Sequence, residues 1–293
     1  GLGGSAEQGL GYDFYADLLK PDFGSRNQNM SARLEGIKQE LYSYRQTALL
    51  ARIGIVRRVN RHWNVSFGGQ IEQEQIQQMG TTNSYFIAAL PLTANYDGTG
   101  VDNPITPATH GVRMGASITP SASLTDGTSF FVIMQATVST YFDLKNFGLS
   151  RPGRSVLAWR GTIGNVEGAS TFDIPPDQRL YAGGSATVRG FRYQGVGPQF
   201  ANTRYAIGGT SMDAGSFEYR QRIMQKFGAV GFIDAGQVTA DRTPFQGTLR
   251  VGAGAGARYY TPIGPVRLDV AVPLNRPARG DKWELYVGLG ETF

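Results

Sequence analysis

Apolar and polar residues alternate along most of the chain with the two-residue period of β-strands. In residues 264–273, four valine and leucine side chains share one parity, and Arg267 and Asp269 take the other. We count about fourteen such segments of roughly ten residues. The clearest are 12–18, 62–71, 85–95, 111–120, 130–141, 155–163, 215–223, 227–238, 248–260, 264–273 and 283–293.

Two stretches near the N-terminus are less regular. Residues 46–59 contain good helix formers, but their β-branched second half, IGIVRRV, favours a strand. Residues 29–38 are more polar and fit a strand less well, and between 31 and 47 we expect strands to be missing or merged.

The polar residues at alternate positions of these segments indicate a closed barrel with a water-filled interior. Charged residues recur at positions that a soluble β-sandwich would bury, namely Arg250, Arg258, Arg267 and Asp269. Aromatic residues stand at strand ends, as in membrane-interface girdles, at Tyr12, Trp63, Tyr141, Trp159 and Trp283. A sandwich or propeller also alternates, but no repeat of fixed period supports a propeller. The sequence therefore predicts an all-β, transmembrane antiparallel barrel.

The composition agrees with this fold and excludes some classes of partner. The chain has 293 residues, 41% hydrophobic, with a mean hydropathy of -0.25, and no apolar stretch approaches the ~20 residues of a spanning helix. It has no cysteine, which excludes disulfides and cysteine metal sites. The net charge is +5, but no basic cluster exceeds two adjacent residues, so we expect no nucleic-acid partner.

A glycine-rich stretch, residues 178–199, interrupts the strands. Its sequence, QRLYAGGSATVRGFRYQGVGPQ, is too rich in glycine for a helix and does not alternate. An ordinary mobile surface loop is one interpretation. Because the flanking segments read as membrane strands, we predict instead that this loop folds into the lumen and that Arg189 anchors it.

Two acidic residues are candidate partners for Arg189. Glu218 and Asp234 occupy inward positions on successive predicted strands, so both carboxylates can converge on one guanidinium. The alternative is that all three are independent, solvated lumen charges.

The sequence offers little support for catalysis. The two histidines, His62 and His110, have no metal-ligand spacing, and no serine lies in a GxSxG elbow. The GAGAGAR run lacks a following helix and a P-loop lysine. We expect no catalytic residue, no metal and no cofactor, and therefore no enzyme.

Four motifs in order resemble the outer-membrane insertase superfamily: LYAGGSATVRGF, SFEY, GFIDAG and GPVRLDVAVPL followed by ELYVGLG. They cover residues 175–293 and are most similar to the barrel subunit of the translocation and assembly module, TamA, with the barrel-assembly subunit BamA more distant. The residues that match the loop motif, the strand motif and the acidic partner are Val188, Arg189, Gly190, Phe191, Phe232, Asp234, Gly236 and Glu218.

The resemblance implies a barrel of sixteen strands, about two more than we count, whose first and last strands meet at a weakly paired seam. We map this seam to residues 1–8 and 283–293, with Gly3, Gly4, Gly288, Gly290 and Phe293 as its residues. Glycines there weaken strand pairing. The family carries periplasmic POTRA domains before the barrel, whereas we assign all of residues 1–293 to the barrel.

The resemblance also implies a function in the bacterial outer membrane. Such barrels insert or export envelope proteins, here autotransporter-type clients, by opening the seam sideways and pairing with client strands. The implied partners are client outer-membrane proteins, outer-membrane lipids with lipopolysaccharide, and a periplasm-spanning TamB-like protein reached through POTRA domains. Two alternatives stay open: a passive porin or receptor-type channel, and a two-partner secretion translocator.

Overall fold

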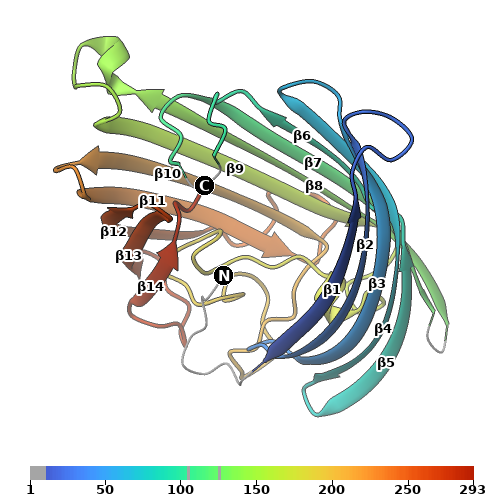
Figure 1. The fold of residues 1–293 in the computed structure, drawn as a ribbon. Coiled ribbons are helices and arrows are strands. Elements are labelled where there is room, and N and C mark those ends of the chain that lie inside the picture. Colours follow the sequence, from blue (N-terminus) through green and yellow to red (C-terminus); the bar gives the residue numbers. More distant parts are fainter. Residues whose placement is uncertain (1–10, 104–105, 125–126) are drawn as a thin grey trace.

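A computed structural model describes residues 11–103, 106–124 and 127–293. They form one antiparallel sheet of fourteen strands that curls around a central space (Figure 1). The strands are β1 (Tyr12–Lys20), β2 (Gln28–Glu40), β3 (Arg45–Arg58), β4 (Trp63–Gln78), β5 (Thr81–Ala89), β6 (Leu92–Asp97), β7 (Gly111–Leu124), β8 (Thr128–Asp143), β9 (Ser155–Glu167), β10 (Ser211–Arg222), β11 (Phe227–Thr239), β12 (Arg250–Thr261), β13 (Gly264–Pro273) and β14 (Glu284–Leu289).

The fourteen strands occupy thirteen positions across the sheet, because β5 and β6 lie end to end. Both pair with β4 on one side and with β7 on the other. The interruption falls at Leu90 and Pro91, where proline has no N–H to donate to a ladder. The predicted count of about fourteen strands is confirmed, and one of the predicted segments, 85–95, contains this break.

The expected shortage of strands at residues 31–47 is wrong. The region holds most of β2 and the start of β3, which pair directly across the short turn 41–44. Polar residues such as Glu35, Lys38 and Gln39 weaken the alternation of β2. Its backbone pairing with β1 and β3 forms all the same, since ladder hydrogen bonds do not depend on side-chain polarity.

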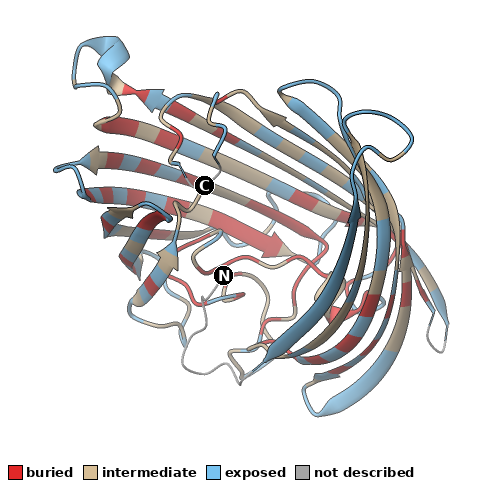
Figure 2. Cartoon of the chain, in the orientation of Figure 1, coloured by how far each residue is buried: buried red, intermediate tan, exposed pale blue. Residues whose placement is uncertain are grey.

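The two faces of the sheet differ as a membrane barrel requires. On β10, the outward ring of Phe217 is 44% exposed, whereas its neighbour Glu218 is fully buried on the inward face. Figure 2 shows buried residues alternating with exposed ones along β10 and β11. Apolar side chains thus face lipid, and the chain is a transmembrane antiparallel β-barrel protein.

The helical content is two short 3₁₀ turns, η1 (Leu144–Phe147) and η2 (Pro176–Gln178). Neither these nor any other helix in the described ranges has the length and apolar character to cross a membrane.

The first and last strands each have one free edge within the described residues. In this part of the chain, β1 pairs with β2 alone. β14 pairs there with β13 alone, and this ladder has six residue pairs. Because the sheet has thirteen positions and every neighbouring pair is antiparallel, the strands at its two ends, β1 and β14, run in the same direction. A direct ladder between these two strands would therefore be parallel, a pairing that is slightly less stable per residue than an antiparallel one.

Candidate functional site at the long loop

The long loop, which we define as residues 168–210 between β9 and β10, lies against the inner face of the sheet (Figure 1). Isolated bridges fold it back on itself, such as Ala182 with Val196. Its apolar side chains form a buried cluster with side chains from β8 to β11. The members of this cluster are Phe131, Val166, Ala169, Ile174, Leu180, Ala182, Val188, Phe191, Val196, Met212 and Val238.

Arg189 is the centre of the polar contacts of this loop, and its side chain is fully buried. Its Nε and Nη2 donate to the two oxygens of Asp234 at 2.7 and 2.9 Å, a bidentate pair. The backbone N–H of Arg189 donates to the same carboxylate at 3.0 Å. One aspartate on β11 therefore holds both the main chain and the side chain of the loop.

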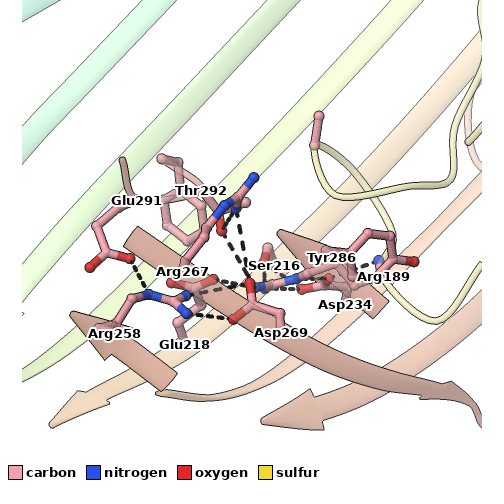
Figure 3. Close-up of polar contacts among 12 residues, drawn as sticks. Arg189, Ser216, Glu218, Asp234, Arg258, Arg267, Asp269, Tyr286, Glu291 and Thr292 are labelled. Carbon is pink, nitrogen blue, oxygen red and sulfur yellow. Dashed lines mark hydrogen bonds and ion pairs between the residues drawn. The ribbon is translucent and has the colours of Figure 1, made fainter. Parts of the chain in front are cut away.

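The remaining nitrogen of the guanidinium faces two further acids. Nη1 forms an ion pair with Glu218 of β10 at 2.7 Å and approaches Asp269 of β13 at 3.6 Å. The guanidinium also stacks on the ring of Phe232, 3.4 Å from its centroid. Figure 3 shows Glu218, Asp234 and Asp269 gathered around Arg189. The arrangement satisfies both edges and one face of the planar guanidinium.

The electrostatics of the site keep Arg189 charged. Burial alone would lower the pKa of its guanidinium, but the hydrogen bond to Asp234 and the charges of Glu218, Asp234 and Asp269 raise the pKa above its ordinary value. Because a buried charge without partners is costly, the acids make this burial tolerable. The site can therefore hold the loop in place.

Glycines allow the loop backbone to approach the wall. Gly190 has φ +94°, and a Cβ there would lie 2.9 Å from the carbonyl of Val272. On β11, a Cβ at Gly236 would lie 2.7 Å from Cγ2 of Val188. Gly252 of β12 likewise leaves room for the carbonyl oxygen of Arg189. Each of these glycines removes a side chain where two backbones or a backbone and a side chain meet.

All eight residues predicted for the loop and its partners are brought together here. Val188, Arg189, Gly190 and Phe191 lie against β10 to β13, and Glu218, Phe232, Asp234 and Gly236 form the facing wall.

Sequence reasoning missed three further contributors. Ser216 accepts from Arg189 at 3.2 Å and donates to Asp234 at 2.5 Å. Tyr286 of β14 accepts from the N–H of Gly190 and donates to the carbonyl of Phe191, at 3.0 and 2.8 Å. For Asp269, the sequence predicts an inward position but not a place in this site. Inward parity was the only available signal for all three, and many other residues share it.

The described residues of the predicted seam lie in different places. Gly3 and Gly4 lie outside the described residues. Gly288 of β14 pairs with Arg267 of β13, and β14 ends at Leu289. Gly290, with φ +88°, turns the chain off the sheet, and Phe293 packs inside, near Tyr141 and beneath Arg160 and Arg220. Of the predicted seam segment 283–293, the last residues thus line the interior and not the edge of the sheet.

Comparisons with known proteins agree with this architecture. The fold is similar to that of BamA from Haemophilus ducreyi lacking POTRA domains 1–3, with a TM-score of 0.77, 16% identity, and coverage of 94% of this chain and 61% of that chain. It is also similar to CdiB from Acinetobacter baumannii (TM-score 0.61, 14% identity, 94% and 49% coverage) and to CdiB from Escherichia coli (0.56, 12%, 94% and 52%). The chain spans between about half and three-fifths of the length of these proteins.

Sequence comparison supplies the family. Residues 2–293 match the Omp85 superfamily domain, which covers nearly the whole chain. Together with the alternating strands and the outward apolar face, this match makes the protein an integral outer-membrane barrel. The chain belongs to the Omp85 superfamily.

Proposed function

We propose that this barrel inserts or exports envelope proteins, and that it does so without enzymatic chemistry. The proposal rests on the edges of β1 and β14 that have no partner strand within the described residues. An unpaired strand edge presents a row of N–H and C=O groups that another chain can extend by β-augmentation. The wall that holds the long loop, β10 to β13, ends at β14, so the anchored loop stiffens the sheet directly behind one of these edges.

The proposed clients are outer-membrane proteins of the autotransporter type, which pair with the edge while surrounding lipid and lipopolysaccharide adjust to the opening. A TamB-like protein is the proposed periplasmic partner. The motif order that most resembles TamA supports this choice, and the similarity to BamA and CdiB supports the shared fold.

Crosslinking tests the edge directly, because the native chain has no cysteine. We would place a single cysteine at Val287 of β14 and present an unfolded autotransporter barrel that carries cysteines on its last strand. We expect a disulfide between client and barrel during assembly. The matched control is Val138→Cys on β8, which also faces outward but lies in a strand paired on both sides.

Equal crosslinking at both positions would contradict strand templating at the edge. A large, steady conductance in planar bilayers, with no effect on client assembly, would favour the passive channel instead. Assembly of one dedicated secreted partner and of no barrel client would favour the two-partner secretion translocator.

A further inference from the structure

Three carboxylates meet on the wall opposite the Arg189 site. Glu72 and Glu74 project inward from β4, and Asp177 belongs to η2 at the start of the long loop. One oxygen from each lies within 4.8 Å of the others, and both glutamates are at most 4% exposed. β4 and β11 face one another across the central space (Figure 1), so this cluster and Arg189 lie at opposite walls, each with a residue of the long loop.

These acids differ from the buried acids around Arg189 in their partners. Glu218, Asp234 and Asp269 each form an ion pair with an arginine. Within the described residues, Glu72, Glu74 and Asp177 form none. Arg179 lies only two residues after Asp177, but it donates to the carbonyls of Ile174 and Ile207 at 2.9 Å.

Two buried oxygens of the cluster also have no N–H donor among the described residues. Gln46 donates to Oε2 of Glu74 at 2.6 Å, and Gln178 donates to Oδ2 of Asp177. In the described part of the chain, the other oxygens, Oε1 of Glu74 and Oδ1 of Asp177, accept from no N–H group, and the two carboxyl groups lie within hydrogen-bond reach of each other. Glu74 is 2% exposed, so water does not reach it freely. Buried carboxylates in proteins are paired, protonated or bound to a metal ion.

The number and type of ligands select among these outcomes. One shared proton relieves the repulsion of a single pair of carboxylates, whereas three converge here. A hard divalent cation is bound by several carboxylate oxygens at about 2.0–2.6 Å, which sets ligands on opposite sides of an ion about 4–5 Å apart. The three carboxylate oxygens lie within 4.8 Å of one another, which fits that geometry.

We propose that Glu72, Glu74 and Asp177 bind one divalent cation of the Ca²⁺ or Mg²⁺ class, which ties the start of the long loop to β4. The cation supplies to this wall the positive charge that Arg189 supplies to the other. The proposal stands apart from the client activity, because it concerns binding and loop attachment alone.

Calorimetric titration of the detergent-purified barrel with CaCl₂ and, separately, MgCl₂ tests the site after the barrel has been stripped with chelator. We expect one ion per chain. Glu74→Gln and Asp177→Asn should each weaken the binding of that ion on the order of tenfold or more, since each removes a charged ligand. Glu167→Gln is the matched control, because Glu167 is half-exposed, forms a long ion pair with Arg242 and accepts a hydrogen bond from Asn165 that a glutamine oxygen can also accept.

Thermal unfolding gives a second readout. The difference in unfolding temperature between wild type and Glu74→Gln should change sign when the ion is removed, which a merely structural role of Glu74 would not produce. With the ion present, wild type should unfold at a higher temperature than Glu74→Gln. In chelator the order should reverse, because the variant has lost one of three mutually repelling carboxylates. Terbium luminescence offers a third readout, since the Tyr181 hydroxyl donates to the carbonyl of Pro176 beside Asp177 and its ring can sensitise a bound ion.

Three results would overturn the proposal. The first is no ion binding by the stripped barrel. The second is binding that both variants retain. The third is stabilisation on acidification in chelator without any effect of the ion, which would identify a shared proton in place of a metal.

Discussion

At the scale of residues, one guanidinium organises the site. Arg189 joins the loop to β10, β11 and β13 through Glu218, Asp234 and Asp269. Buried ion pairs contribute little net stability on average, because desolvation offsets attraction. Removing one partner is different, since it leaves the other charge buried and poorly matched.

The first prediction concerns Asp234→Asn. This change keeps the size of the side chain but removes the charge that accepts three donors from Arg189. We expect a loss of about 2–4 kcal/mol, because Glu218 and Asp269 still face the guanidinium and limit the usual 3–5 kcal/mol cost. Urea unfolding of the barrel in detergent measures this loss of stability. Asp241→Asn, at an exposed position after β11, should change stability by less than about 0.5 kcal/mol.

A second prediction tests the steric fit of the loop against the wall separately from its ion pairs. Gly236→Ala places a methyl group against Cγ2 of Val188 and should displace the loop without altering any ion pair partner. We expect faster proteolysis within residues 188–193 and a loss of about 1–3 kcal/mol. Gly231→Ala on the same strand has open space around it, and a comparable effect there would refute the steric explanation.

At the scale of elements, the last strand is the least supported one and yet carries a loop contact. β14 pairs with β13 alone within the described residues, and Tyr286 links it to the backbone of Gly190 and Phe191. The loop therefore stabilises the strand whose free edge we assign to clients. The Tyr286 hydroxyl thus links the anchored part of the loop to β14.

The third prediction follows from that hydroxyl. Tyr286→Phe leaves the buried N–H of Gly190 and carbonyl of Phe191 without their partner, which costs about 1–3 kcal/mol. Hydrogen exchange should quicken in β14 and in residues 188–192, while β9 and β10 stay protected. Tyr259→Phe, an outward and 41% exposed tyrosine, is the control and should leave both regions unchanged.

At the scale of the whole molecule, the long loop connects the two halves of the sheet. Connections between antiparallel strands alternate between two ends, so the 41–44 turn and the long loop lie at the same end. Tyr42 in that turn contacts Arg192, 4.0 Å from its ring centroid, and Tyr205, 5.4 Å between ring centroids. The loop thus reaches from the Arg189 wall to the turn between β2 and β3.

The fourth prediction tests this long-range contact. Tyr42→Ala removes the ring that Arg192, Arg204 and Tyr205 surround. We expect trypsin to cleave after Arg204 several times faster in the folded barrel, since local opening becomes cheaper by about 1 kcal/mol. Met79→Ala, in the neighbouring β4–β5 turn, should not change the cleavage rate; if it did, a general loosening of that end would explain the result.

The sequence alone determined the strands, the two faces and the eight residues assigned to the loop and its wall. Strand formation and facing follow from local alternation, and VRGF, SFEY and GFIDAG carry their charges at inward positions. It did not determine that β2 continues through its polar stretch, because backbone pairing between neighbours decides that.

Only the tertiary structure decided which inward residues meet. Ser216, Asp269 and Tyr286 come to Arg189, and Glu72, Glu74 and Asp177 come together on the far wall, because strand register and the path of the long loop set distances across the curled sheet. The same holds for the turn at Gly290, after which Phe293 lies in the interior of the barrel. There Phe293 contacts Arg160 of β9 and Arg220 of β10, which lie more than seventy residues earlier in the chain.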